Sequence, residues 1–282
     1  MDSKRASRLS SIDGLRGVLA MVVVYEHTRG CLLHGHTDSP GQFAVMAFFM
    51  MSGYVLTRGW NGDFLPFLAK RFVRLWPLFA LTFAIGALIR GDAPAWTYFF
   101  WYPFVCDPVK SSVLLANSPM WSQFVEAWAA LFMPLIVWTS RSTMRVIAAM
   151  AIAMVCFRFD RCFLYAALFI VGAFFSTRDF NLPLLNGRAL QWLGRISYSL
   201  YLTHSIVLDL CDRYLPGAAW LEIPVALAVA HVVWLVVDRP SVRASRWVGR
   251  ATGHAKAAVL DAIRRRAGSP AGAKRLEAGG LP

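Results

Sequence analysis

Residues 11–30 read SIDGLRGVLAMVVVYEHTRG, an apolar stretch of membrane-helix length that carries charge where charge is costly. Arg16 and His27 lie eleven residues apart, so in an α-helix both side chains leave the same face, about 16 Å apart along the axis. Ionisable groups inside a spanning helix mark functional sites. Simpler explanations stay open: Arg16 as an anchor that reaches the lipid headgroups, and His27 as a histidine at the opposite rim.

The composition extends the apolar pattern to the whole chain. Of its 282 residues, 57% are hydrophobic and 16% are charged, and the mean hydropathy is +0.49. These values predict an all-α, polytopic membrane protein without a separate globular domain. The net charge of +13 is typical of cytoplasmic loops and tails beside anionic lipid heads. We therefore expect membrane lipids as partners, and no nucleic acid.

Apolar runs between charged or Pro/Gly-containing segments predict a helical bundle of about eight spans. The predicted spans are 12–29, 41–58, 74–90, 119–139, 143–158, 162–177, 193–211 and 219–237. The connection 91–118, rich in aromatic residues and proline, is expected to be interfacial or re-entrant. We divide the chain into a membrane-embedded domain, 1–240, and a basic tail, 241–282, with a surface helix over 241–267 and a disordered end.

The basic residues predict the orientation. Lys4, Arg5 and Arg8 precede the first apolar run, but no small-residue cleavage site follows, so we expect an uncleaved first span. Most of the 29 Lys and Arg fall on the same side as the N-terminus when the spans alternate. The positive-inside rule then predicts that the N-terminus and the C-terminus are both cytoplasmic.

The five cysteines form no CxxC pair and no zinc-binding spacing, so no metal site is expected. Free thiols are the expected state, and a disulfide between Cys31 and Cys106 is the alternative. The other cysteines are Cys156, Cys162 and Cys211.

Two segments carry charged side chains within apolar surroundings, one of them basic and the other acidic. In FLAKRFVRLWPLF, Arg71 and Arg74 lie one turn apart beside Lys70, which suits a phosphorylated ligand, although a positive-inside anchor is an alternative. In NSPMWSQFVEAWAALFMPL, Ser122 and Glu126 share one helix face. A carboxylate inside a membrane helix needs a cationic or hydrogen-bonding partner. Further on, Pro134 is expected to kink the helix.

A third segment, LGRISYSLYLTHSIVL, aligns Ser197, Tyr201 and His204 on one stripe. These side chains could line a polar cavity, relay a proton or hold an acceptor sugar. A packed aromatic helix with one satisfied histidine is the alternative. His231, in the last predicted span, is interpreted as structural.

Together, these segments resemble the acyltransferase 3 family, integral membrane enzymes that move acyl groups onto hydroxyls of envelope glycans and related acceptors. The matching pieces are, in chain order, IDGLRGVLAMVVVYEH, FFMMSGYVL, KRFVRLWP, the pattern of Trp121, Ser122 and Glu126, LGRISYSLYLTH, and VDRP at Asp238.

The resemblance implies roles for several positions. It makes Arg16 and His27 essential, links Arg71 and Arg74 to the acyl donor, and implies acyl-CoA as that donor, with no permanently bound cofactor. His27 would act as general base or transient acyl carrier, and Arg16 would fix the donor or stabilise charge. Either Glu126 or a tyrosine of the predicted span 193–211 could orient the His27 ring. The expected activity is transfer of an acyl group, acetyl first, to a free or lipid-linked glycan at the bacterial inner membrane.

The chain departs from the family in three ways. It has about eight predicted spans where about ten are usual, AWAAL follows Glu126 in place of an aromatic pair, and Thr203 stands where a bulkier residue is common. Two other functions stay open. One is a transporter or flippase, whose permeation path would use the same buried charges. The other is a non-catalytic relative that serves in assembly.

Overall fold

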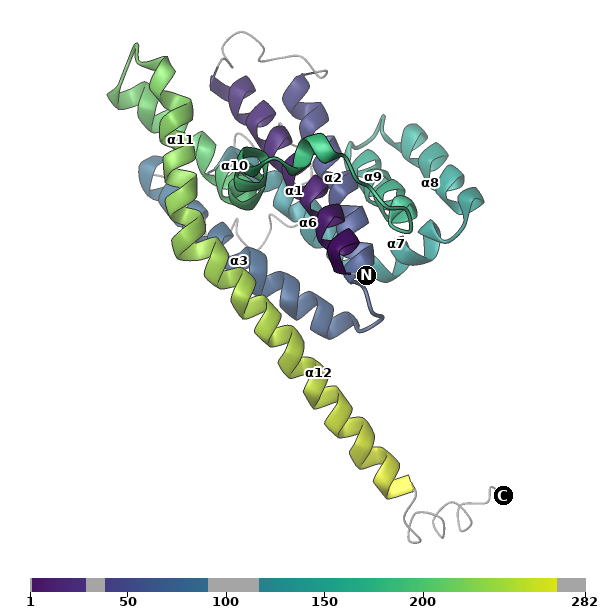
Figure 1. Cartoon of the computed structure of the whole chain (residues 1–282). Coiled ribbons are helices and arrows are strands. Elements are labelled where there is room, and N and C mark those ends of the chain that lie inside the picture. The colour runs from purple at the N-terminus through teal and green to yellow at the C-terminus, as the bar shows by residue number, and fades with distance from the viewer. Residues whose placement is uncertain (1, 29–38, 91–116, 268–282) are drawn as a thin grey trace.

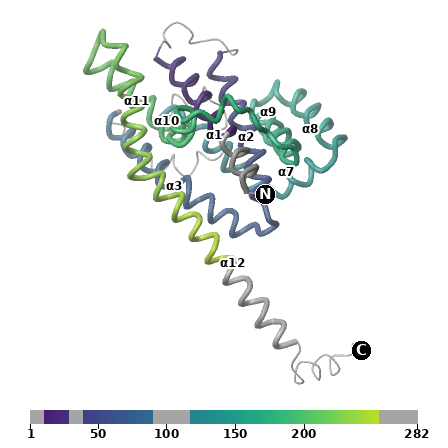
Figure 2. Tube along the Cα trace, viewed as in Figure 1, coloured from purple at the N-terminus to yellow at the C-terminus, as the bar shows by residue number. Residues whose placement is uncertain are grey.

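The computed structural model describes residues 2–28, 39–90 and 117–267, and all regular structure in these ranges is helical (Figures 1 and 2). The elements, in order, are α1 (Asp2–Thr28), α2 (Pro40–Gly59), α3 (Phe64–Arg90), η2 (Ser118–Met120), α6 (Trp121–Leu131), α7 (Met133–Ser140), α8 (Thr143–Cys156), α9 (Cys162–Phe175), η3 (Pro183–Asn186), α10 (Arg188–Tyr214), α11 (Ala219–Val233), η4 (Trp234–Asp238) and α12 (Arg239–Ala267). The predicted all-α class is confirmed.

All eight segments predicted as spans are helical, but the count of eight spans is not confirmed. Within the described ranges, two helices are long and apolar enough to cross a membrane, Phe64–Ile89 and Ala219–Gly253, and the bent pair α6 and α7 is a third candidate. Helix α10 is not among them. Its polar residues, which include Ser197, Tyr201 and His204, are buried inside the bundle and lower the mean hydropathy of the segment.

Helix α1 crosses α10 in close contact, and glycines make this approach feasible (Figure 1). A Cβ added to Gly194 would lie 2.0 Å from the carbonyl oxygen of Asp13, and one added to Gly17 would lie 2.7 Å from Cβ of Leu193. Small residues at helix contacts let the two backbones approach closely. The glycines of IDGLRG and LGRISYS therefore bring the polar faces of α1 and α10 together.

A second close contact joins α2 to α9. A Cβ on Gly53 would lie 2.1 Å from the Phe169 carbonyl oxygen, and one on Gly172 would lie 1.8 Å from that of Met50. Beside this contact the ring of Phe49 packs against Trp121, Tyr165 and Phe169, with centroids 5.0–5.9 Å apart. The Trp121 and Tyr165 rings also contact each other, so this aromatic cluster packs α6 and α9 against α2 and against one another.

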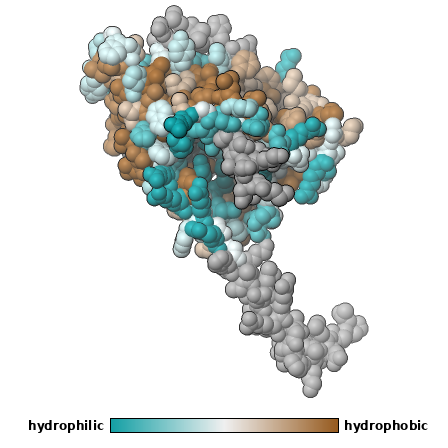
Figure 3. Space-filling model, in the orientation of Figure 1, coloured by the Kyte–Doolittle hydropathy of each residue, from teal (hydrophilic) through white to brown (hydrophobic). Residues whose placement is uncertain are grey.

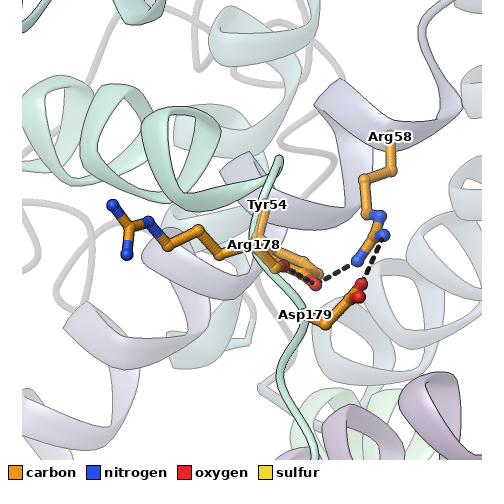
Figure 4. A network of polar contacts seen from close by, with 4 residues as sticks. All are labelled: Tyr54, Arg58, Arg178 and Asp179. Carbon is orange, nitrogen blue, oxygen red and sulfur yellow. Dashed lines mark hydrogen bonds and ion pairs between the residues drawn. The ribbon is translucent and has the colours of Figure 1, made fainter.

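Polar contacts close the other end of the α2–α9 pair (Figure 4). The Tyr54 hydroxyl donates to the Arg178 carbonyl oxygen over 2.8 Å, and Arg58 donates to that hydroxyl and to Asp179, the latter over 3.2 Å. These bonds tie the end of α2 to the segment that follows α9.

The helix expected to kink near Pro134 does so. Helices α6 and α7 meet at 71°, with Phe132 between them and Pro134 in the first turn of α7. Proline lacks the backbone N–H that a continuous helix needs, which is the physical reason for a break here.

Helices α11, η4 and α12 follow one another without interruption, and α12 packs along α3 before it leaves the body (Figure 1). The predicted helix over 241–267 is thus confirmed as part of α12. Figure 3, in the orientation of Figure 1, shows hydrophobic residues over the upper part of the molecule and hydrophilic residues around the region from which α12 departs.

Several predictions lie outside the described residues. These are most of the connection 91–118, the Cys31–Cys106 alternative and the end of the tail from residue 268; the side chains of Lys4, Arg5 and Arg8 also lie outside the described ones. Among the described cysteines, Cys156, Cys162 and Cys211 are free thiols.

Candidate functional site

A polar cavity of about 220 Å³ lies where α1, α2, α3, α6 and α10 meet. Its lining holds three guanidinium groups and one carboxylate, from Arg16, Arg71, Arg74 and Glu126. We call this the charged cavity. The excess of positive charge favours an anionic ligand, and a volume below the roughly 300–1,000 Å³ of drug-sized sites suits a diphosphate or a short chain.

Arg71 and Glu126 form an ion pair across the cavity, between α3 and α6. Their side chains are only 18% and 17% exposed, so the pair is well shielded from solvent. Glu126 was expected to need a cationic partner, and Arg71 is that partner. Because Glu126 is engaged here, it does not orient His27, whose Nδ1 is bonded elsewhere.

Arg16 and Arg74 line the same cavity, and carboxylates of Asp13 and Asp238 interact with them. The Arg16 guanidinium lies 3.8 Å from the carboxylate of Asp13, one turn earlier in α1. Arg16 and Arg74 both interact electrostatically with Asp238, a buried residue at the end of η4. One Asp238 oxygen has no hydrogen-bond partner among the described residues. Asp238 therefore supplies a negative charge behind two of the three arginines.

Hydroxyl side chains complete the wall of the charged cavity. Ser122 lines it from α6, on the face that it was predicted to share with Glu126, and Ser197 and Tyr201 line it from the predicted stripe of α10. The Ser122 hydroxyl donates to Pro119 O over 3.0 Å, and the Ser197 hydroxyl donates to Gly194 O over 2.9 Å. Ser197 thus uses its proton within α10, whereas Ser122 donates to the preceding η2 and also hydrogen-bonds with the Tyr201 side chain.

His27 and His204 form a second site at the C-terminal end of α1, about three turns beyond Arg16. Their rings meet edge to face with centroids 4.9 Å apart. Nδ1 of His27 lies 2.7 Å from Val23 O, and Nδ1 of His204 lies 2.7 Å from Tyr201 O. We call these residues the imidazole pair.

The backbone contacts fix the tautomers of the imidazole pair. A carbonyl oxygen only accepts hydrogen bonds, so each Nδ1 carries the proton and each Nε2 presents a lone pair. Nε2 of His204 is buried with no partner among the described residues, whereas His27 is exposed at the end of α1. His27 Nε2 is therefore available as a base or nucleophile, with an unsatisfied acceptor beside it.

The structure places some predicted site residues apart. His27 and His204 do not line the charged cavity, whereas Tyr201 does, and its ring lies 5.9 Å from that of His204. Tyr201 thus lies between the two sites. Glu26, which is next to His27 in sequence, accepts a hydrogen bond from the Gly41 backbone N–H. His231 takes a hydrogen bond from Trp192 over 3.3 Å, consistent with a structural role.

Three further residues were not in the predicted set. Asp238 has been described above; its signal in the sequence was a carboxylate that ends an apolar run just before a proline. Gln123 and Tyr198 also line the charged cavity, and the Tyr198 hydroxyl lies 3.3 Å from the Gln123 side-chain oxygen and 3.1 Å from Leu75 O. Neither had a charge or spacing that set it apart.

Within the described ranges, no group of three His, Cys, Asp or Glu side chains is arranged to hold a metal ion. The chemistry available at the two sites is that of guanidinium, carboxylate, hydroxyl and imidazole groups.

Comparison with known proteins identifies the family. The acyltransferase 3 model, described as an acyltransferase domain, matches residues 9–175, more than half of the chain. The chain belongs to the acyltransferase 3 family. The match contains α1, α3 and α6, and with them Arg16, His27, Arg71, Arg74 and Glu126. The resemblance predicted from the sequence is confirmed.

One curated relative of this chain is "Protein 2 in picA locus" from Rhizobium radiobacter. The two are 34% identical over 94 residues, which is 31% of this chain. The match covers about half of the relative's length, 48%. No solved structure matches this chain.

Proposed function

We propose that this acyltransferase moves an acyl group, acetyl in the first instance, from acyl-CoA to a hydroxyl of an envelope or exported polysaccharide. The observation that carries the proposal is the arrangement of a charged cavity with three arginines beside a pair of buried and exposed imidazoles, linked through Tyr201. Residues 1–240 would form the catalytic domain, with the basic tail outside it.

The charged cavity would hold the phosphates of the donor. Among the described residues, Arg74 makes no ion pair and the ion pair of Arg16 is the 3.8 Å contact with Asp13. Asp238 interacts with both guanidinium groups electrostatically, without a direct ion pair. Both guanidinium groups can therefore turn their forks to phosphate oxygens. Arg71 would add a third contact, with Glu126 holding its guanidinium in place. The pantetheine arm would run along α1 toward His27.

The imidazole pair would carry out the transfer. As general base, His27 Nε2 takes the proton of the acceptor hydroxyl, whose oxygen attacks the thioester carbonyl; the C–S bond breaks and coenzyme A leaves as the thiol once protonated. As an acyl carrier, the same nitrogen attacks the thioester first and passes the acyl group to the hydroxyl. Ser122, Ser197 and Tyr201 would position the acceptor.

The surroundings of the enzyme follow from its charge distribution. We place it in the bacterial inner membrane with the N-terminus and the C-terminus in the cytoplasm, since most basic residues then face inside. The donor would enter at the charged cavity from the cytoplasm, and a free or lipid-linked glycan would meet His27 near the outer side. No permanently bound cofactor takes part in this scheme.

The test is mass spectrometry of envelope glycans and lipids from cells that lack the gene, complemented with wild-type enzyme, His27→Ala or His231→Ala. We expect an ester of defined mass with wild-type and His231→Ala, and none with His27→Ala at equal membrane levels. A full ester signal with His27→Ala would contradict the mechanism. Movement of a glycan across the membrane without consumption of acyl-CoA would favour a transporter.

A further inference from the structure

A second basic site lies at the crossing of α3 and α12, outside the charged cavity. The hollow measures about 580 Å³ and is lined by Lys70, Arg243, Arg246, Gly249 and Arg250. We call it the basic hollow. The lining includes four cationic side chains and no acidic one.

The helices hold this arrangement through specific contacts. Arg243, Arg246 and Arg250 follow a spacing of three and four residues, which puts them on one face of α12. The Ser245 hydroxyl donates to the Lys70 carbonyl oxygen over 2.9 Å. A Cβ on Gly249 would lie 2.5 Å from Cδ of Lys70, so the absence of a side chain at this position lets the lysine stem lie against α12.

The charge of the basic hollow is uncompensated. No ion pair among the described residues includes any of its four cations. The charged cavity differs, because Glu126 and Asp238 lie beside its arginines. Clustered like charges repel one another, and a bound anion removes that cost.

The location of the basic hollow points to a membrane lipid. Helix α12 directly continues the apolar α11 and η4, which belong to a candidate membrane span. Arg239 lies over the ring of Trp234, 5.6 Å from its centroid, and Trp247 is 66% exposed beside the hollow. Aromatic and basic side chains that follow an apolar span lie at the level of the headgroups.

The hollow is separate from the donor site. Lys70 and Arg71 are neighbours in sequence, but Lys70 lines the basic hollow and Arg71 lines the charged cavity, and the two linings share no residue. The phosphate chemistry is common to both. The position at the end of an apolar helix selects a lipid phosphate over a soluble one.

We propose that the basic hollow binds the phosphate of an anionic phospholipid, such as phosphatidylglycerol or cardiolipin, and fixes α12 against α3 at the membrane surface. Basic pockets between membrane helices on the cytoplasmic side recognise such headgroups. This binding is independent of acyl transfer and can be measured without it.

The test uses the purified full-length chain, delipidated in neutral detergent and titrated with cardiolipin, phosphatidylglycerol or phosphatidylcholine under native mass spectrometry. The triple variant Arg243→Gln, Arg246→Gln, Arg250→Gln removes three charges from the hollow. The matched control, Arg141→Gln, Arg178→Gln, Arg188→Gln, removes three exposed charges that line neither described site.

We expect wild-type and control proteins to retain the anionic lipids over phosphatidylcholine, and the triple variant to bind them roughly a hundredfold more weakly, about fivefold for each charge. A single Arg246→Gln variant, with about a fivefold loss, gives the same answer if the triple variant does not fold. Equal retention by variant and control overturns the proposal. Binding of coenzyme A or inorganic phosphate that the triple variant loses, without lipid retention, also overturns it.

Discussion

The charged cavity and the imidazole pair both include residues of α1 and α10, but they differ in how they are built. The cavity draws charged side chains from several helices and balances three arginines against Glu126, with Asp238 behind them. The imidazole pair needs only α1 and α10, and its rings are fixed by backbone carbonyl oxygens. The first arrangement suits binding of an anion, and the second suits transfer of a proton or an acyl group.

This difference predicts that substitutions in the two sites change different kinetic constants. Loss of a binding arginine raises the KM for the donor, whereas loss of an imidazole lowers kcat. The predictions below test this separation, and they are ordered by the size of the expected effect.

The largest effect is expected from His27→Gln, which keeps the size of the side chain but removes the base. We expect kcat for acyl transfer to fall about 10²–10⁴-fold, the contribution typical of a positioned acid or base. The control is His231→Gln, at a histidine that lines neither site and is held by Trp192. Steady-state kinetics with purified protein measure both, and wild-type kcat in His27→Gln would break the distinction between the sites.

The next effect concerns stability. Arg71→Gln leaves the shielded carboxylate of Glu126 without its cation, and we expect a loss of about 3 kcal/mol in the free energy of unfolding. The double variant Arg71→Gln, Glu126→Gln should recover most of this stability but not the affinity for acyl-CoA. Denaturation in detergent measures the stability, and titration with acyl-CoA measures the affinity. If the double variant recovered both stability and affinity, Arg71 would serve only the fold.

A smaller effect is expected at the contact that brings both sites together. Gly194→Ala places a Cβ against the Asp13 carbonyl oxygen, and overpacking of this kind costs about 1–3 kcal/mol. Because Asp13 lies one turn from Arg16, the donor KM should rise as well. Gly59→Ala is the matched control, since nothing lies within 4 Å of an added Cβ there. Equal unfolding midpoints for the two variants would contradict this account of the α1–α10 contact.

The smallest effect is expected from His204→Phe, which keeps a ring against His27 but removes its buried Nε2. We expect kcat to fall about tenfold, which corresponds to about 1.4 kcal/mol. This is the value of one hydrogen bond, which Nε2 of His204 would accept from the reacting groups, and donor affinity should not change. Single-turnover measurements at saturating donor separate this from a binding defect. A variant as fast as wild type would show that His204 only packs.

The sequence predicted the helices, and which residues share a helix face, better than it predicted the contacts between helices. Arg16 and His27 could be placed on one helix face because helical periodicity is a local property. His204 beside His27, and Arg71 beside Glu126, depend on how distant helices pack, and spacing along the chain carries no such information. The suggested link between Glu126 and His27 failed for this reason.

The number of spans and the position of Asp238 also depend on how the helices pack, which spacing along the chain does not predict. Helix α10 buries its polar stripe inside the bundle, and these polar residues lower its mean hydropathy, so α10 is not among the candidate membrane spans. In the sequence, Asp238 stood in the VDRP piece of the family resemblance without an assigned role, whereas the structure brings it to Arg16 and Arg74 from a different helix. The glycines of α1 and α10 were visible too, but their value lies in contacts between the helices.

The most direct test of the central claim is equilibrium binding of acetyl-CoA to purified wild-type, His27→Gln and Arg74→Gln proteins. The account predicts that His27→Gln binds acetyl-CoA with wild-type affinity although it is inactive, and that Arg74→Gln binds it about tenfold more weakly or worse, since a charged hydrogen bond is lost. Wild-type affinity in Arg74→Gln together with weak binding in His27→Gln would contradict the assignment of donor binding to the charged cavity and of transfer to the imidazole pair.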